Sequence, residues 1–201
     1  MEGKFILLTG APGVGKSTIT RSIETRISPM TRIGFGDLIF EVKKQLGTIE
    51  NYEQLRATPD KSIPINYVSL AAEVLLNRVT LLRHATNIIL DSHAVVNDYF
   101  GFRIVPEIND FERVKIDAVI VVHAPFEIVE QRVIREPKGR NPISKHSFEK
   151  HQTMQDAVAI HFSLLAKCPM YVVETDDDLS KSLYILQEIF QSIGMSFQKN
   201  Q

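Results

Sequence analysis

The chain of 201 residues carries 23 Lys and Arg against 24 Asp and Glu, which leaves a net charge of −1. Hydrophobic residues make up 44% and charged residues 23%, so the composition excludes an intrinsically disordered chain and a fibrous repeat. The length fits one domain with inserted sub-regions better than two full domains. Because the net charge is close to zero, no general field attracts nucleic acid or anionic lipid. We therefore expect a single domain, residues 1–201, that binds neither, and in which a local basic cluster holds any anionic ligand.

Neither a leader nor a membrane segment is expected. The apolar run near the amino terminus, Phe5–Leu8, is too short for the core of a signal peptide. The longest strand-like run, Ala118–Val122, is far shorter than a membrane span. The single cysteine, Cys168, cannot form an internal disulfide, and we expect it to pack as a small hydrophobic residue. These features predict a cytoplasmic protein.

Short apolar runs alternate with helical patterns along the chain. The runs are Phe5–Thr9, Arg32–Phe35, Asn87–Asp91, Ala118–His123 and Met170–Glu174. Strands that are almost continuously apolar need helices over both faces, which is typical of a parallel sheet. The pattern predicts an α/β fold with a parallel sheet between two layers of helices.

Two segments show the helical period of 3.6 residues. Apolar residues recur at this spacing from Tyr67 to Leu82, after Pro64, and again from Leu179 to Ile193. The second segment follows a run of three aspartates, residues 176–178. We interpret these carboxylates as charge that favours the start of a helix, rather than as a metal site.

The strongest motif follows the first apolar run. The sequence Gly10-Ala11-Pro12-Gly13-Val14-Gly15-Lys16-Ser17-Thr18 fits the pattern G-x-x-x-x-G-K-[ST] between a strand and a helix. In such a loop, glycines let successive backbone N–H groups turn inward around an anion, and the next helix points its positive end at the same place. The motif predicts that these nine residues bind the phosphates of ATP.

Individual side chains of the motif have separate expected roles. Lys16 supplies a mobile positive charge for the β and γ phosphates, and Ser17 offers a hydroxyl to Mg²⁺. The third apolar run delivers Asp91 to its carboxyl end, where ligands bind in such sheets. Asp91 is therefore a candidate Mg²⁺ partner, direct or through water, although a carboxylate at this place can also serve a turn.

A basic segment lies in the second half of the chain. Residues 132–150 contain six Lys and Arg against two Glu, a local charge of +4 that leaves −5 on the remainder. Pro137, Gly139 and Pro142 indicate a loop there. A short loop with arginines is suited to close over a triphosphate as a lid and to neutralise the charge on the transferring phosphoryl oxygens. The alternative is a solvated basic loop.

Together these residues resemble the nucleoside monophosphate kinases, and among them the archaeal-type adenylate kinases, over nearly the whole chain. The matching pieces are the glycine-rich loop, Gly34–Asp37 with the helix through Gly47, Glu53–Arg56, Asp91–His93, and the lid arginines Arg132, Arg135 and Arg140. The resemblance implies a P-loop NTPase sandwich of three layers with a five-stranded parallel sheet, a small helical acceptor region and a short lid. It also implies a homotrimer.

Site roles follow from the same resemblance. Residues from about 36 to 85 would hold the monophosphate acceptor, and residues 136–147 would form the lid. The residues that would contact the acceptor are Asp37, Arg56, which would bind its phosphate, and His93. The residues that would take part in catalysis are Lys16, Arg132, Arg135 and Arg140, and Arg132 would also lie against the adenine of ATP.

The sequence departs from the family pattern in three places. The family has an Arg-Ala pair in the helix after the lid, where this chain has Asp156-Ala157 and thus the opposite charge. The loop Asp98–Pro106 lacks most of the family's Gly and Pro residues, and either its Arg103 replaces the lost positive charge or the acceptor pocket has another shape. The lid is short.

The predicted function is Mg²⁺-dependent transfer of the γ-phosphoryl group of ATP to a nucleoside monophosphate, with AMP as the leading acceptor. One alternative is a kinase with another nucleotide or a small metabolite as acceptor, and a second is a nucleotide-dependent ATPase or switch. Nucleic-acid binding by the basic loop is disfavoured because the loop lacks interleaved aromatic residues. His93 either contacts the acceptor or caps its turn. The histidines expected to be structural or exposed are His84, His123, His146, His151 and His161.

Overall fold

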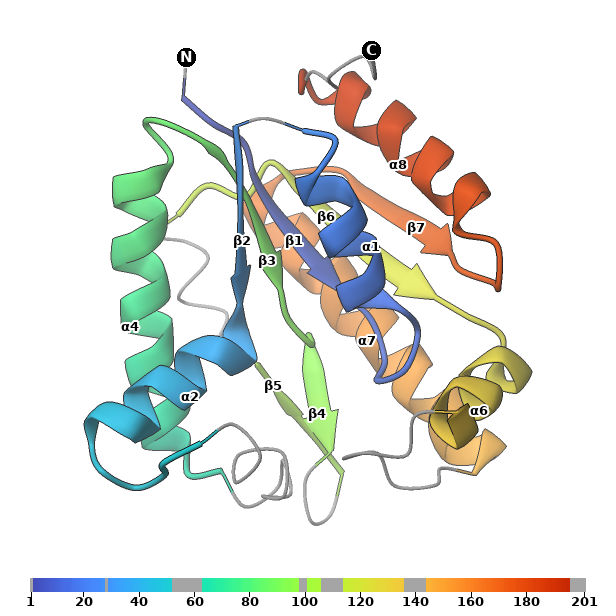
Figure 1. The fold of residues 1–201 in the computed structure, drawn as a ribbon, viewed down its shortest axis with the longest axis horizontal. Coiled ribbons are helices and arrows are strands. Elements are labelled where there is room, and N and C mark those ends of the chain that lie inside the picture. Colours follow the sequence, from blue (N-terminus) through green and yellow to red (C-terminus); the bar gives the residue numbers. More distant parts are fainter. Residues whose placement is uncertain are drawn as a thin grey trace.

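Five parallel strands form the central sheet in the computed structural model, which describes residues 2–27, 29–51, 63–97, 101–105, 114–135 and 144–195. The strands are β1 (Phe5–Thr9), β2 (Met30–Gly34), β3 (Asn87–Asp91), β6 (Ala118–His123) and β7 (Met170–Glu174), in the order β2-β3-β1-β6-β7 (Figure 1). All neighbouring pairs are parallel, so the predicted sheet is confirmed. The carboxyl ends of the strands therefore share one edge, where ligands of such folds bind.

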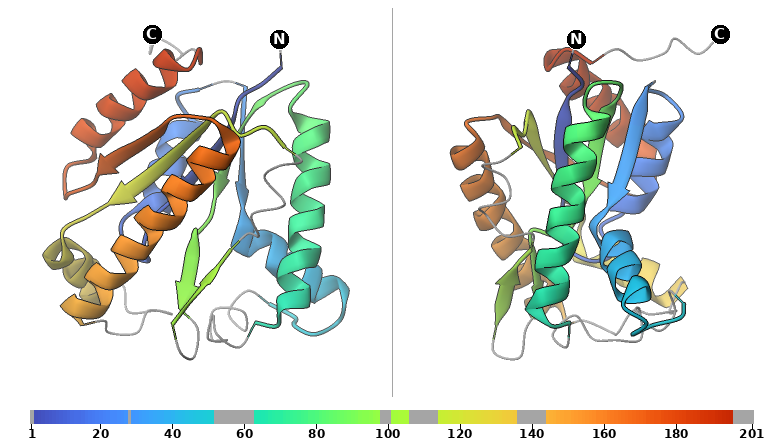
Figure 2. Two further views of the ribbon diagram at one scale, coloured as in Figure 1. Left: turned by 180° about the vertical axis from the view of Figure 1, so that it is seen from behind. Right: turned by 90° about the vertical axis from the view of Figure 1, so that its left-hand side faces the viewer.

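Helices cover both faces of the sheet. On one face lie α1 (Lys16–Glu24) and α8 (Leu179–Ser192), and on the other lie α2 (Phe35–Gln45), α4 (Ile65–Leu82) and α7 (Lys145–Ala166) (Figure 2). A further helix, α6 (Phe126–Arg135), follows β6. The three-layer α/β/α architecture is confirmed.

Each face of the sheet has its own apolar core because side chains alternate along the strands. In β1, Phe5 and Leu7 pack with α2, α4 and α7, whereas Ile6 and Leu8 pack with α1 and α8. All four side chains are fully buried. Burial on both sides explains why β1 reads as a continuous apolar run rather than as an alternating one.

Strand β2 differs slightly from its predicted limits. It begins at Met30 instead of Arg32 and ends at Gly34, because pairing with β3 stops where Gly34 faces Asp91, the last residue of β3. Phe35 instead begins α2 and is buried in the core with Leu38.

A small hairpin was not expected from the sequence. Strands β4 (Val95–Asn97) and β5 (Phe102–Ile104) pair antiparallel, with Val95 opposite Ile104. Each strand has only three residues, too few for a clear alternating pattern. The hairpin begins four residues after β3 ends and contacts α7, so it extends the structure beyond the carboxyl edge of the main sheet (Figure 1).

The opposite edge of the sheet is closed by a buried arginine. The Arg83 guanidinium donates to the carbonyls of Gly3 and Lys115 and to the carboxylate of Asp117. Asp117 also accepts a hydrogen bond from the backbone N–H of Phe5, at 2.9 Å. These bonds join the ends of α4, β1 and the segment before β6 at the amino edge.

Helix α4 is the one helix among the described residues that is long and apolar enough to cross a membrane by length and composition alone. A buried face of this helix, formed around Ala71, Leu75 and Val79, packs in the core against α2 and β3. Core helices of water-soluble proteins pass the same test, so this finding is weak as an indication of a span.

Candidate active site

The loop between β1 and α1 has the backbone that its glycines permit. Gly15 precedes α1 with a φ of 95°, in the left-handed region that side chains disfavour. Gly10 lies so close to β6 that a Cβ atom on it would be 2.3 Å from the carbonyl oxygen of Val122. The loop is therefore pressed onto the carboxyl edge of the sheet at the start of a helix, the place where anions bind.

Lys16 is nearly buried, and its ammonium lies inside the loop. The Nζ atom donates to the carbonyl oxygens of Gly10, at 2.7 Å, and Ala11, at 3.3 Å. It also lies 3.2 Å from Nδ1 of His93. A positive charge is thus held where the N–H groups of the loop and the first turn of α1 converge.

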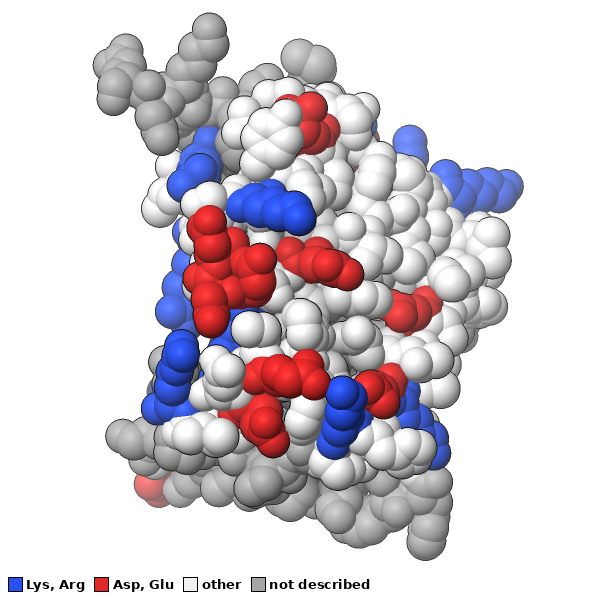
Figure 3. Space-filling view, turned by 90° about the vertical axis from the view of Figure 1, so that its right-hand side faces the viewer, with Lys and Arg blue, Asp and Glu red and all other residues white. Residues whose placement is uncertain are grey.

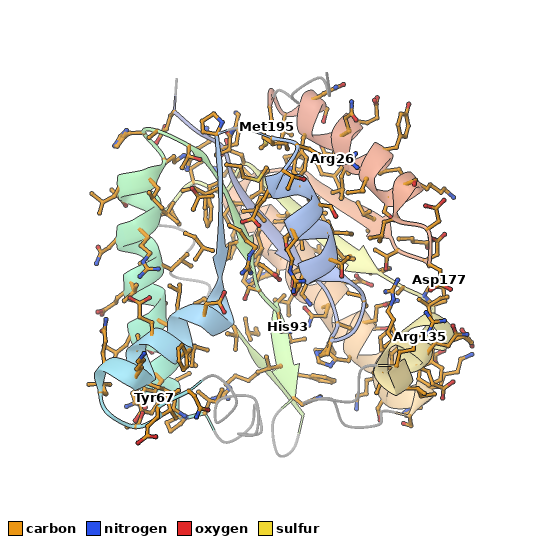
Figure 4. The ribbon with its side chains drawn as sticks, viewed as in Figure 1. Arg26, Tyr67, His93, Arg135, Asp177 and Met195 are labelled. Carbon is orange, nitrogen blue, oxygen red and sulfur yellow. The ribbon has the colours of Figure 1, made fainter. Side chains whose placement is uncertain are left out.

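His93, labelled in Figure 4, contacts the first residue of the loop, Gly10. Burial and the nearby Lys16 hold the pKa of His93 well below its usual range, so the imidazole is neutral. Its Nδ1 lies between the Gly10 carbonyl oxygen, at 2.8 Å, and Nζ of Lys16, at 3.2 Å. The structure thus joins His93 to Gly10 and Lys16.

Ser17 and Asp91 meet beside the loop. The Ser17 hydroxyl lies 3.5 Å from Oδ2 of Asp91, at the end of β3. Burial raises the pKa of Asp91 despite the opposing effects of Lys16 and Arg32. Hydroxyl and carboxylate oxygens are ligands that suit Mg²⁺, so the donor set fits this ion. The described residues contain no group of three or more His, Cys, Asp or Glu side chains that could hold a metal ion by themselves.

Arg32 belongs to the same cluster, although no motif in the sequence marks it. Its guanidinium lies 3.5 Å from Asp91 Oδ2, 3.2 Å from Asp37 Oδ2 and 4.0 Å from Glu24 Oε1. The predicted acceptor residue Asp37 is thereby linked to the predicted metal residue Asp91. The one indication in the sequence is the alternation of side chains along a strand, which places Arg32 on the opposite face from the buried Ile33.

Arg132 lies along the outside of the loop. Its NH1 atom is 3.1 Å from Oγ1 of Thr175 and 3.4 Å from the Gly13 carbonyl oxygen, and NH2 donates to the carbonyl of Asp176. A Cβ atom on Gly15 would lie 3.2 Å from this guanidinium. Arg132 therefore extends from α6 to the phosphate loop and to the residues that follow β7.

Thr175 was missed by the sequence analysis. Its hydroxyl donates to the Val14 carbonyl and receives the bond from Arg132, and its backbone N–H donates to the His123 carbonyl. This buried residue follows β7, and only its position after an apolar strand indicated a role. It fastens the outer side of the loop to the sheet.

Arg135, the next of the predicted lid arginines, pairs with an acidic side chain instead of the loop. Arg135 is exposed and lies 3.9 Å from Asp177. Both side chains are labelled in Figure 4. Lys145 similarly pairs with Glu127, at 2.9 Å. On the face that carries α6 and α8, acidic side chains are interspersed with basic ones (Figure 3). The carboxylates beside Arg135 and Lys145 partly offset the +4 charge counted in the sequence.

Some predicted residues lie outside the described part of the chain. Arg56, Arg140 and residues 136–143 of the predicted lid belong to this group. The last four residues of the predicted lid, 144–147, are described: Ser144 caps α7 by accepting a hydrogen bond from the Ser147 N–H.

A buried amide connects α7 to the site. Gln155 Oε1 lies 3.0 Å from the Thr9 hydroxyl and 2.8 Å from the Ala94 N–H, and its Nε2 donates to the Val95 carbonyl. His151 lies one turn earlier, 3.1 Å from the same carbonyl. No motif in the sequence marks Gln155, although it joins the end of β1 to the hairpin.

Asp156 is paired within the protein. Its Oδ1 lies 2.6 Å from Nε2 of His123, the last residue of β6. His123 thus has a structural partner, and the exposed histidines are His84, His146 and His161. Where the family pattern has an arginine, this chain therefore has a carboxylate that is hydrogen-bonded to the imidazole of His123.

Two other predictions about single residues agree with the structure. Asp178 caps α8 by accepting a hydrogen bond from Ser180 N–H at 2.9 Å, so the aspartate run marks a helix start. Cys168 is half-buried and packs against the core beside α7.

Comparison with known proteins agrees with this geometry. A family model described as an AAA domain matches residues 9–149. The adenylate kinase of Methanopyrus kandleri is 27% identical over 88% of this chain and 91% of its own. The adenylate kinase of Pyrococcus furiosus is also 27% identical, over 86% and 87%.

Solved structures share the fold. The tunicamycin resistance protein of Deinococcus radiodurans superimposes with a TM-score of 0.56 at 12% identity, over 98% of this chain and 99% of its own. The thymidylate kinase of Candida albicans gives a TM-score of 0.55 at 13% identity, with the same coverage. At this identity the likeness concerns the architecture alone.

Proposed function

The chain belongs to the AAA domain family and is a P-loop kinase, and we propose that it transfers the γ-phosphoryl group of ATP to a nucleoside monophosphate, with AMP as the first candidate. The observation that carries the proposal is the glycine-rich loop closed around the Lys16 ammonium, beside the Ser17 and Asp91 oxygens. The similarity to two adenylate kinases over most of the chain supports the choice of acceptor.

In this proposal the loop binds the phosphates of ATP. Lys16 exchanges the carbonyls of Gly10 and Ala11 for phosphate oxygens, which are stronger acceptors because they are charged. Arg132 and Thr175 border the outer side of the loop and would lie near the base and the phosphates. The proposed ATP-binding residues are Gly10, Ala11, Pro12, Gly13, Val14, Gly15, Lys16, Ser17, Thr18 and Arg132.

Ser17 and Asp91 would hold Mg²⁺, Asp91 directly or through water. When bound, such an ion neutralises charge on the β and γ phosphates. The chain itself contributes position and charge: Lys16, Arg132, Arg135 and Arg140 are the cations proposed to act on the phosphoryl group. A reaction of this type needs no covalent nucleophile, because in-line alignment and charge stabilisation provide most of the rate enhancement. Closure of the lid would exclude water from the γ phosphate.

The acceptor is proposed to lie between α2 and the loop. Asp37, in the first turn of α2, is linked through Arg32 to Asp91, so the acceptor side and the phosphate side are contiguous. Arg56 is proposed to bind the acceptor phosphate, and His93 to border it.

The resemblance to archaeal-type adenylate kinases also supports a homotrimer, which sedimentation equilibrium would test.

A second acceptor class is favoured by one observation. Asp156 holds a hydrogen bond to His123 at the position where an arginine would clamp an anion. A pocket that has the Asp156–His123 pair in place of a guanidinium has one positive charge fewer to bind the acceptor phosphate. Another nucleotide or a small hydroxyl metabolite is therefore the alternative acceptor.

A coupled assay of ADP formation tests the proposal. The purified chain is given Mg²⁺ and ATP with each of a panel of nucleoside monophosphates and small hydroxyl compounds. Stimulation by AMP above all others supports the first candidate, and stimulation by a different compound identifies the second. ADP release that no acceptor increases would instead indicate an ATPase or switch, and would reject both.

A further inference from the structure

Arg32 is surrounded by carboxylates from three different elements. It extends from the edge strand β2 to Asp91 of β3, Asp37 of α2 and Glu24 of α1, at 3.5, 3.2 and 4.0 Å. Its side chain is 30% exposed. One guanidinium therefore connects the strand that carries the metal candidate with the helix on the acceptor side.

The contacts with Asp91 converge on a single oxygen. Oδ2 of Asp91 is 3.5 Å from Ser17 Oγ and also 3.5 Å from Arg32 NH1. The oxygen that would face a cation beside Ser17 is thus the one that Arg32 approaches. A divalent ion bound there would be repelled by the guanidinium, and this repulsion is strong because the Asp91 side chain is only 10% exposed.

Arg32 has partners to which it can turn. Asp37 is 51% exposed and Glu24 is 37% exposed, so both remain accessible when Asp91 is engaged by another charge. A move of the guanidinium away from Asp91 would therefore leave it paired. The loss of the Asp91 contact is offset when a divalent cation takes the place of the guanidinium beside that carboxylate.

Building on the proposed function, we propose that Arg32 is a positioning residue that holds Asp91 until metal and nucleotide arrive, and that it then releases Asp91 while it keeps its contact with Asp37. In this arrangement Arg32 weakens metal binding, and Asp37 strengthens it by drawing the guanidinium away. The first turn of α2 is thereby coupled to the metal side of the phosphate loop through one salt-bridge exchange.

The proposal gives opposite signs to two neighbouring substitutions. Arg32→Gln removes the competing charge, and we expect Mn²⁺ to bind the protein in the presence of ADP about tenfold more tightly. Asp37→Asn leaves Arg32 more closely paired with Asp91, and we expect binding to weaken severalfold. The double variant should resemble Arg32→Gln, because Asp37 acts only through Arg32.

Electron paramagnetic resonance of free Mn²⁺ provides the measurement, with the full chain, ADP and no acceptor. Arg78→Gln is the matched control, because Arg78 pairs with Glu41 between α2 and α4 and its loss changes the net charge equally. Circular dichroism checks that each variant is folded. The control should bind Mn²⁺ as the parent protein does.

The outcomes separate the two proposals. If the parent protein binds no Mn²⁺ with ADP, the proposed function fails and this inference fails with it. If it binds, but Arg32→Gln is unchanged or weaker, or if both substitutions shift binding in the same direction, only the role of Arg32 is overturned. An equal shift in Arg78→Gln would assign the effect to net charge and would likewise overturn it.

Discussion

Lys16 combines burial with partners that a phosphate can replace. Its ammonium is held by two carbonyls of the loop, so the side chain is already placed before any ligand adds its own contacts. It contributes little to the apolar core, which lies below the loop. Loss of this charge should therefore affect chemistry much more than folding.

We expect Lys16→Ala to lower kcat by about 10²-fold or more, in line with the loss of one charge that stabilises a transition state. The thermal unfolding curve should change little. Initial rates of ADP formation under saturating ATP measure the effect, and Lys4→Ala is a control at a lysine that lies at the opposite edge of the sheet. A kcat within twofold of the parent value would remove Lys16 from the catalytic machinery.

Cys168 illustrates how burial controls a thiol. Burial raises its pKa to about 11, mainly by disfavouring the thiolate. At pH 8 only about one thiol in a thousand is then ionised, and the thiolate is the species that reacts. Alkylation by iodoacetamide in the native protein should be slow at pH 8, and faster by about tenfold per pH unit up to pH 10. Mass spectrometry of timed samples measures this rate. Rapid alkylation at pH 8, equal to that of the unfolded chain, would contradict the assigned pKa.

At the scale of elements, Gln155 joins three pieces of structure through one side chain. It binds the end of β1, the residue before β4, and β4 itself. All of these partners are buried, so none can turn to water when the amide is removed.

Gln155→Leu should therefore cost about 1 to 3 kcal/mol of unfolding free energy, the usual penalty for a buried donor left unpaired. Urea unfolding followed by circular dichroism measures it. Gln191→Leu is the control, because Gln191 is an exposed residue of α8. Equal stability of the two variants would mean that the hydrogen bonds of Gln155 contribute nothing to the free energy of unfolding.

Elements defined by local pattern could be predicted, whereas those defined by distant contacts could not. Four strands have the predicted limits, because each is a short apolar run between turn residues. The limits of β2 depend on where β3 stops pairing. The β4–β5 hairpin is too short to leave a periodic signal, and it is stabilised by α7, more than fifty residues later.

The candidate site divides in the same way. The loop residues are contiguous, so a motif finds them all. Arg32, Thr175 and Gln155 are single polar residues whose partners lie far along the chain, and no spacing in the sequence marks them. Arg135 was predicted from the basic segment and the family resemblance, and the structure shows it 3.9 Å from Asp177. Contiguous motifs thus mark the residues proposed to carry the chemistry more readily than the residues that position them.

At the scale of the whole molecule, the two edges of the sheet have different roles. The carboxyl edge carries the phosphate loop, and the amino edge is fastened by Arg83 and Asp117, which are both about 90% buried. Because the charge of Arg83 is buried and paired, its loss leaves the buried Asp117 with Lys4, at 3.4 Å, as its remaining charged partner.

We expect Arg83→Leu to lower the unfolding free energy by about 3 to 5 kcal/mol, the usual cost of breaking a buried ion pair. The KM for ATP should be unchanged at a temperature where the variant is folded. Denaturant titration and initial rates measure the two quantities, with the exposed Arg21→Leu as control. A large rise in KM without loss of stability would show that the two edges are not independent.

The hydrogen bonds of Gln155 also give α7 a fixed point near its middle. The helix begins at Lys145, ten residues earlier, so its first turn lies about 15 Å from this point at 1.5 Å per residue. Rotation of α7 about Gln155 by about 10° would displace that end by about 2.6 Å. The amino-terminal half of the helix thus connects a fixed point beside the phosphate loop to the segment predicted to close over the nucleotide.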